Sequence, residues 1–135
     1  MDINLVLEKS GTGYSAYSND LPGLVTAGET FEEIIDNFAE VIEMQADYLE
    51  ENGKEKESKE LRNAKLHYYL DLDTFFNYYS LFNKSELAKY LGINPSLLRR
   101  LSSNSNKVEL SEKKALQIKN GLHKLAQELQ HYNFA

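Results

Sequence analysis

Residues 84–101 read KSELAKYLGINPSLLRRL, and this stretch predicts two short helices joined by a tight turn. Gly92 stands where the first helix would end, in a left-handed conformation that glycine adopts at little cost. Asn94 suits the N-cap of the second helix, and Pro95 suits its first position. The inner face of the first helix is expected to consist of Leu87, Ala88 and Leu91, with Ile93 beneath the turn and with Leu98 and Leu101 packing the second helix on the first. The layout is typical of a helix-turn-helix, whose second helix enters the major groove of DNA.

The outward face of the second helix is the part expected to contact DNA. Arginine can bind guanine through two hydrogen bonds, and arginine or serine can bind a phosphate. The residues expected to bind DNA are Lys84, Ser85, Asn94, Ser96, Leu97, Arg99, Arg100 and Lys107. Asn104 and Asn106, beside Lys107, fit phosphate contacts and plain loop positions equally well. The alternative for the whole stretch is an ordinary helical hairpin with two solvated arginines.

Charge is divided along the chain. Residues 1–80 hold 6 basic and 17 acidic side chains, a formal charge of −11, and residues 81–135 hold 9 basic and 4 acidic ones, a charge of +5, which together give the −6 of the whole chain. Because Lys and Arg neutralise phosphates, only the C-terminal part is suited to bind nucleic acid. An acidic module beside a basic one favours two partners, one of them cationic.

Composition limits the class of protein. The 135 residues suffice for one domain or two small ones, and 41% of them are hydrophobic, enough for a core. With no cysteine, disulfides and thiolate metal sites are excluded. No signal peptide is recognised, and no apolar run approaches the roughly 20 residues that span a bilayer. We expect a cytoplasmic protein with no membrane partner and no cofactor.

The N-terminal half reads as an α+β unit. Alternating residues predict four strands: Asp2–Glu8, Gly13–Ser18, Leu24–Ala27 and Leu66–Leu72. Thr30 and Glu33 form a capping box that starts a helix reaching about Glu51. The charged segment 52–65 is predicted to be an exposed connection with some helical character. Asp73 is a suitable N-cap for a helix over Thr74–Leu81. The order β-β-β-α-β predicts an antiparallel hairpin and a strand that returns after the helix.

This order, and a set of residues within it, resemble the HicB family of bacterial antitoxins. The matching residues are Tyr14, Asp20, Leu21, Pro22, Gly23, the strand 24–26, Gly28, Thr30, Glu33 and the amphipathic helix after them. Leu24 stands where the family often has cysteine. The resemblance implies a partial RNase H-like domain over residues 1–73, followed by an all-α helix-turn-helix domain over residues 74–135.

The resemblance also implies a function. Such an antitoxin neutralises a small basic RNA-cleaving toxin of the HicA type and represses its own operon by binding double-stranded operator DNA. An acidic domain suits a cationic partner. The expected toxin contacts are Asp20, Leu21, Glu32, Asp36 and Glu40, although an acidic run is usually a solvated helix face.

Two other functions remain open on the sequence. A residual RNase H-like nuclease would need carboxylates converging on Mg²⁺. Asp2, Glu8, Asp71 and Asp73 lie on or near the predicted strands, but none lies in the middle of the first strand. We therefore expect no enzyme, no catalytic residue and no metal site; His67, His123 and His131 also lack ligand spacing. The other alternative is a transcriptional regulator whose acidic domain senses a small ligand.

A C-terminal helix is predicted from Ser111 to about Tyr132. Its apolar residues recur at spacings of three and four: Ala115, Ile118, Leu122, Leu125 and Leu129. Part of this stripe must cover the two short helices, and Leu125 and Leu129 are left to pair with a second chain. A homodimer, or a higher homo-oligomer, would place two recognition helices about 34 Å apart on a palindromic operator. Packing within one chain is the alternative.

Overall fold

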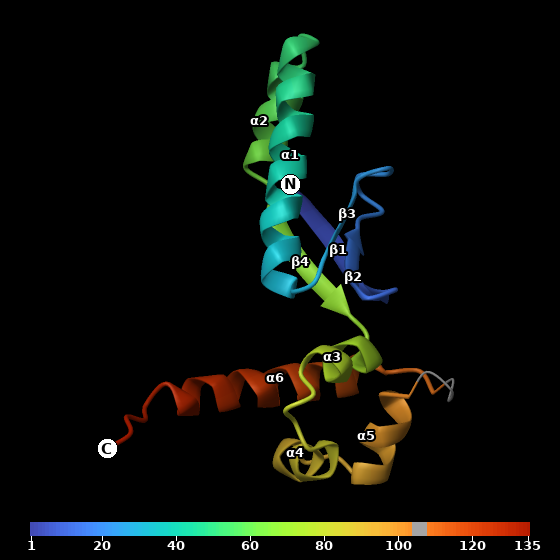
Figure 1. Ribbon diagram of the computed structural model, residues 1–135, viewed down its shortest axis with the longest axis vertical. Helices are drawn as coiled ribbons and strands as arrows, with labels where there is room; N and C mark the ends of the chain where they lie inside the picture. Colours follow the sequence, from blue (N-terminus) through green and yellow to red (C-terminus); the bar gives the residue numbers. More distant parts are fainter. Residues whose placement is uncertain (104–107) are drawn as a thin grey trace. The chain divides into compact units, whose positions relative to one another are not determined.

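The computed structural model describes residues 1–103 and 108–135. The fold is mixed α+β, as predicted, and the chain divides into two compact units, residues 1–74 and 75–135. Figure 1 labels the helices and strands of the two units. Within the described residues, no helix combines the length and the apolar character needed to cross a membrane.

A four-stranded sheet forms one layer of the first unit. Its strands are β1 (Asp2–Ser10), β2 (Gly13–Tyr17), β3 (Val25–Gly28) and β4 (Lys65–Leu70), in the order β3-β2-β1-β4. β1 and β2 are antiparallel, as are β2 and β3, whereas β4 runs parallel to β1. The predicted hairpin and returning strand are confirmed. The fourth strand ends at Leu70 rather than at the predicted Leu72.

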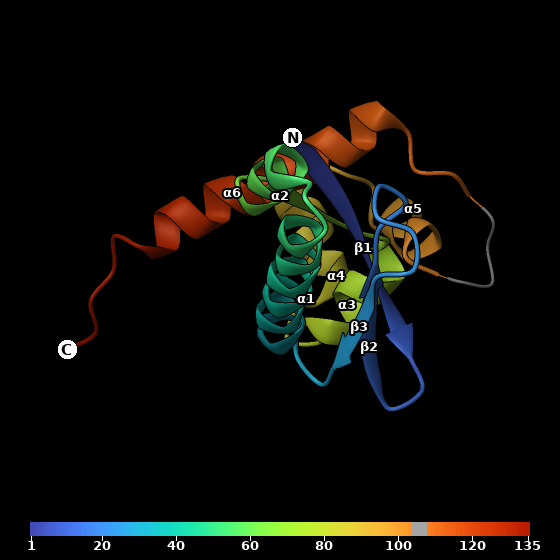
Figure 2. The ribbon, with the colours of Figure 1, turned by 90° about the horizontal axis from the view of Figure 1, so that it is seen from above.

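Helix α1 (Phe31–Glu51) covers one face of this sheet (Figure 2). Its start is the predicted one, because the Thr30 hydroxyl accepts a hydrogen bond from the Glu33 amide at 3.1 Å. The core between helix and sheet consists of side chains that alternate along β1 and recur along α1: Ile3, Leu5, Leu7, Ala16, Phe31, Ile34, Phe38 and Ile42. The apolar residues that alternate along β1 and those that recur along α1 therefore pack into one core.

Helix α2 (Glu55–Arg62) corrects the expectation of an exposed connection over residues 52–65. It packs on α1, where Ser58 and Leu61 are buried. The Ser58 hydroxyl donates a hydrogen bond to the carbonyl oxygen of Ala46 at 2.8 Å. Ala46 is fully buried, and its small side chain lets the two helices approach closely. Two buried residues among eight mostly charged ones are too few to show a period in the sequence.

Arg62 fastens α2 to the acidic side of α1. Its guanidinium donates to Glu43 Oε1 at 3.0 Å, to Glu50 Oε2 at 3.2 Å and to Asp47. A further hydrogen bond joins it to the Ser58 hydroxyl at 2.8 Å. Its side chain is 29% exposed, which limits screening of the group by water.

We expect Arg62→Ala to lower the free energy of unfolding of the first unit by about 1 kcal/mol, because it leaves three carboxylates of α1 without their shared cation. Urea unfolding at low and high NaCl measures the effect, and the difference from wild type is expected to shrink with salt. Lys59→Ala, on the same helix and exposed, is the matched control and is expected to change little. A salt-independent loss would attribute the effect to packing of the arginine stem instead.

Helix α3 (Leu72–Tyr78) begins and ends earlier than the predicted 74–81 helix. The predicted N-cap, Asp73, is wrong: Asp71 fills that role, since its Oδ1 accepts from the Thr74 amide at 2.7 Å. Asp73 instead pairs with Lys9 Nζ at 2.7 Å. Aspartate is a favourable N-cap at either position. Asp71 takes this role because β4 ends at Leu70 and α3 begins at Leu72.

The second unit contains α4 (Lys84–Leu91), α5 (Pro95–Leu101) and α6 (Glu112–Leu129). The turn between α4 and α5 is the predicted one, with Gly92 at φ 73°. Asn94 Oδ1 caps α5 by accepting from the Ser96 amide at 2.8 Å. Among the described residues of this unit, seven apolar side chains are buried: Phe76, Leu87, Ala88, Leu91, Ile93, Leu98 and Ile118. Helix α6 ends at Leu129, short of the predicted Tyr132.

Helix α6 crosses the end of α4 at very short range. A Cβ atom added to Gly121 would lie 2.2 Å from Leu91 Cδ2, so only glycine fits there with Leu91 in its present position. Four residues earlier, the Gln117 side-chain amide donates to the carbonyl oxygens of Leu91, at 3.0 Å, and Gly92, at 3.2 Å. These carbonyls have no partner within α4, so α6 both covers and caps that helix end.

Candidate nucleic-acid interface

The outward face of α5 carries the cationic side chains singled out from the sequence. Ser96, Arg99 and Arg100 are exposed, Leu97 is half-buried, and Leu98 is fully buried against α4. The two arginines stand at the last turn of α5, next to the carbonyl end of that helix, which is a favourable place for cations. The face is therefore accessible and positively charged.

Arg99 links the first turns of α4 and α5. Its Nη1 donates to the Ser85 hydroxyl at 3.1 Å, and its Nη2 donates to the Ser96 hydroxyl at 3.3 Å. Ser85, Ser96 and Arg99 were each predicted as DNA contacts, and the structure brings them together in one network. Two of the five N–H groups of the guanidinium are used in this way, which leaves donors for an acceptor outside the protein. Its orientation is thus set before any ligand binds.

Arg100 differs from its neighbour. Its side chain is exposed and makes no hydrogen bond or ion pair within residues 1–103 and 108–135. A long side chain of this kind can follow a phosphate at little conformational cost. The two arginines therefore offer two different contacts, one held in place and one adaptable.

The other predicted DNA contacts are placed less favourably. Lys84 Nζ lies 5.2 Å from the centre of the Phe76 ring, an attractive cation–π contact that holds the ammonium against its own unit. Asn94 is exposed, but its side-chain oxygen is engaged in capping α5. Lys107, together with Asn104 and Asn106, lies outside the described residues.

The predicted toxin contacts fall into two separate places. Glu32, Asp36 and Glu40 are exposed at four-residue intervals and form one acidic row along α1. Asp20 is held elsewhere, because its Oδ2 accepts from the Asn4 amide at 2.8 Å, where the pairing of β1 with β2 has ended. Leu21 is half-buried and its carbonyl accepts from the Leu24 amide at 3.2 Å. Among the described residues, no hydrogen bond or ion pair joins Asp20 or Leu21 to the acidic row of α1.

The carboxylates considered for a nuclease each have another partner. Asp2 pairs with His67 at 3.0 Å, and the hydrogen bond from His67 is the main cause that lowers the pKa of Asp2. Glu8 contacts the Tyr17 hydroxyl at 3.5 Å, Asp71 caps α3, and Asp73 raises the pKa of Lys9 through their hydrogen bond. Across the described residues, no three His, Asp or Glu side chains converge as metal ligands would.

Comparison with known proteins adds no relative: no protein-family model, curated protein or solved structure matches the chain.

Proposed function

We propose that the chain is a toxin-neutralising antitoxin that also represses its own operon, with the second unit binding operator DNA through α4 and α5 in the manner of a helix-turn-helix. The observation that carries the DNA half is the Ser85–Ser96–Arg99 network, which presents an oriented guanidinium on the exposed face of α5. A pre-oriented arginine suits guanine, whose N7 and O6 accept two parallel hydrogen bonds.

The division of charge supports a separate role for each unit. Residues 1–74 contain 6 basic and 17 acidic side chains, a formal charge of −11, whereas residues 75–135 contain 9 and 4, a charge of +5. DNA would repel the first unit and attract the second. An acidic surface that does not bind nucleic acid is suited to a cationic protein, and a basic RNA-cleaving toxin of the HicA type has that chemistry. The HicB-like residue pattern of the first unit supports the same partner.

We expect Arg99→Ala and Arg100→Ala each to weaken binding to a duplex from the region upstream of the chain's own gene, by about 1–3 kcal/mol where the arginine binds a base. The two variants are expected to differ in their salt dependence. Loss of a phosphate contact by Arg100→Ala reduces the slope of log K against log salt by about one, whereas loss of a base contact by Arg99→Ala relaxes sequence preference.

Fluorescence anisotropy over a salt series, with the upstream duplex and a scrambled duplex, measures both effects. Lys119→Ala, an exposed lysine on α6, is the matched control and removes the same charge from the same unit. If both arginine variants bind the upstream duplex with wild-type affinity at fixed salt, α5 is not the helix that contacts the bases.

The toxin half is tested with the full chain and the product of a neighbouring gene that encodes a small basic protein. We infer that the α1 row takes part, so the triple variant Glu32→Lys, Asp36→Lys and Glu40→Lys should weaken the complex in calorimetric titration while leaving the preference for the upstream duplex over the scrambled one intact. The triple variant Glu55→Lys, Glu57→Lys and Glu60→Lys, at exposed positions of α2, makes the same change of charge and is the control for charge alone. An unchanged affinity would remove the α1 row from the interface.

A further inference from the structure

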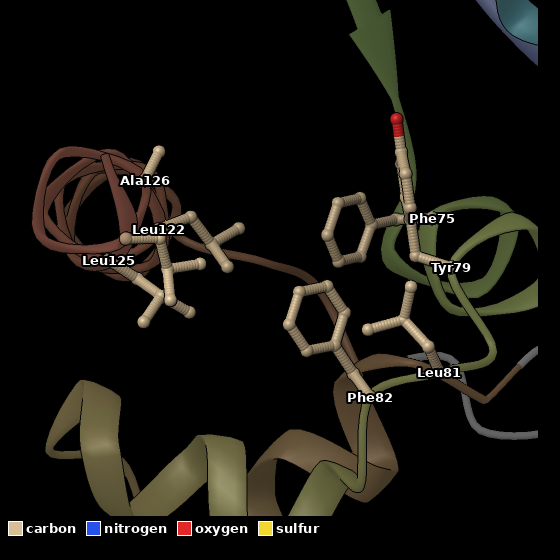
Figure 3. Close-up of a pocket in the computed structure, with 8 residues that line it drawn as sticks. Phe75, Tyr79, Leu81, Phe82, Leu122, Leu125 and Ala126 are labelled. Atoms are coloured by element: carbon tan, nitrogen blue, oxygen red, sulfur yellow. The ribbon is translucent and has the colours of Figure 1, made fainter. Parts of the chain in front are cut away.

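An apolar groove opens within the second unit (Figure 3). Its volume is about 340 Å³. One wall is the C-terminal half of α6, and the other is formed by α3 and the turn that follows it; the lining residues are Phe75, Tyr79, Leu81, Phe82, Leu122, Leu125, Ala126 and Leu129. The Tyr79 hydroxyl is the one polar side-chain group among them. Small-molecule sites usually add several polar groups that orient the ligand, so this lining favours a purely apolar occupant.

Both walls of the groove are held in place without an occupant. The rings of Phe75 and Tyr79 lie 5.0 Å apart between centroids, and those of Phe75 and Phe82 lie 6.0 Å apart and stacked. On the other side, the Gly121 and Gln117 contacts fix α6 on the end of α4. The rim is open to solvent, since Leu81 is 77% and Leu129 is 60% exposed. A preformed apolar opening of this kind is typical of an interaction site.

The C-terminal segment, residues 130–135, carries side chains that match this groove. Phe134 is 98% exposed, and Tyr132 is 61% exposed. The hydrogen bonds His131 N to Glu128 O, at 3.1 Å, and Tyr132 N to Leu129 O, at 3.4 Å, continue the last turn of α6. The segment therefore runs on along the helix: Tyr132 still lies near Tyr90 of α4, and beyond it Figures 1 and 2 show the end of the chain pointing away from the other helices of the unit. It carries Phe134 away from the groove of its own copy.

We propose that two copies of the chain exchange these segments, so that Phe134 of each copy fills the groove between α3 and α6 of the other. A two-fold axis makes the exchange reciprocal and closes the assembly at two chains. The inference deepens the proposed function and rests on it, because the dimer would present two copies of α5 to one operator.

The expected size of this interface follows from the groups that it buries. A buried phenylalanine removes about 150–250 Å² from solvent. One Phe134 ring in each groove, counted with the wall that it covers, gives roughly 600–1,000 Å² over both copies, and the rest of each segment and the exposed rim residues Leu81 and Leu129 supply the remainder of a specific interface. Without the exchange, the exposed Phe134 ring and the open groove both remain in water, which is unfavourable for each.

The test measures the dimer without DNA, by sedimentation equilibrium of the full chain. We expect a dimer in wild type, and a dissociation constant raised at least about 30-fold by Phe134→Ala, the effect of a central aromatic anchor. Leu129→Glu, at an exposed rim position where the fold tolerates a charge, should act in the same way. Leu116→Glu, on α6 and 55% exposed but outside the groove, is the matched control and should leave the dimer intact.

A mixing experiment distinguishes exchange of the C-terminal segments between two copies from a segment that folds back into the groove of its own copy. Phe134→Ala retains its groove, and Leu129→Glu retains its segment, so an equimolar mixture should form a one-to-one complex through a single filled groove, whereas neither variant alone should dimerise at that concentration. A monomeric wild type, or a dimer that neither variant weakens, overturns the proposal. Because DNA is absent, these outcomes are independent of whether the second unit binds an operator.

Discussion

Replacing Phe38 with alanine is expected to lower the free energy of unfolding of the first unit by about 3–5 kcal/mol. Phe38 is fully buried and is the largest side chain in the described residues with essentially no exposure. It lies in the first half of α1, a helix that packs on β2 and β3. Removal of the ring forfeits its transfer from water and leaves a cavity that neighbouring Ile34 and Ile42 fill only in part. A unit of 74 residues has little stability to lose, because small domains have small cores.

The same substitution tests whether the two units unfold separately. The second unit has its own core, built around Leu98 and Ile118, so Phe38→Ala should speed amide hydrogen exchange in β1 and α1 and leave exchange in α4 and α5 unchanged. Affinity for the cationic partner should fall, and affinity for DNA should stay. Ile35→Ala, in the same helix but 37% exposed, is the control and is expected to cost much less. Equal acceleration throughout the chain would mean that the units unfold as one.

Replacing Leu98 with alanine should destabilise the second unit and leave the stability of the first unit unchanged. Leu98 is fully buried and seats α5 on α4, and its truncation is expected to cost about 2–5 kcal/mol. Helix α5 has only seven residues, too few to be stable without its packing. The Ser85–Ser96–Arg99 network depends on that packing, because it joins residues on two different helices.

DNA binding is therefore expected to be lost in Leu98→Ala, while the partner affinity of the first unit is retained. The measurements are anisotropy with the upstream duplex and hydrogen exchange over 84–101. Leu116→Ala removes the same side chain from an exposed position of α6 and serves as the control. Wild-type DNA affinity in Leu98→Ala would show that the α4–α5 pair does not form the interface.

The sequence predicts best where one residue type is strongly preferred for a local reason. Gly92 and Asn94 defined the α4–α5 turn correctly, because a left-handed backbone favours glycine and a free amide at a helix start favours a short polar side chain. The alternating apolar residues of β1 and the helical spacing of apolar residues in α1 likewise predicted the core of the first unit. In each case the information lies within a few residues along the chain.

What the sequence did not provide depends on contacts between distant residues. Some helical character was predicted for residues 52–65, but the packing of α2 on α1 was not, because it rests on Ser58 meeting Ala46 twelve residues away. The link between Arg99 and Ser85 depends on how α4 and α5 cross, which the periods of the two helices do not fix. Leu125 and Leu129 were expected to be left for a second chain, but their position in one groove with Phe75 and Phe82 follows from the tertiary fold.

The contact at Gly121 has a consequence for how this protein could diverge. It holds the first part of α6 close to the end of α4, whereas the residues after Gly121, together with the α3 side of the groove, would set where the second copy of the proposed dimer lies. One residue inserted there turns the following side chains by about 100° and advances them by about 1.5 Å. Such an insertion would turn Leu122, Leu125 and Leu129 away from the groove and would therefore undo the proposed pairing of two copies, while the α4–α5 face stayed as it is. Descendants of this protein would in this way lose the dimer without any change in α5.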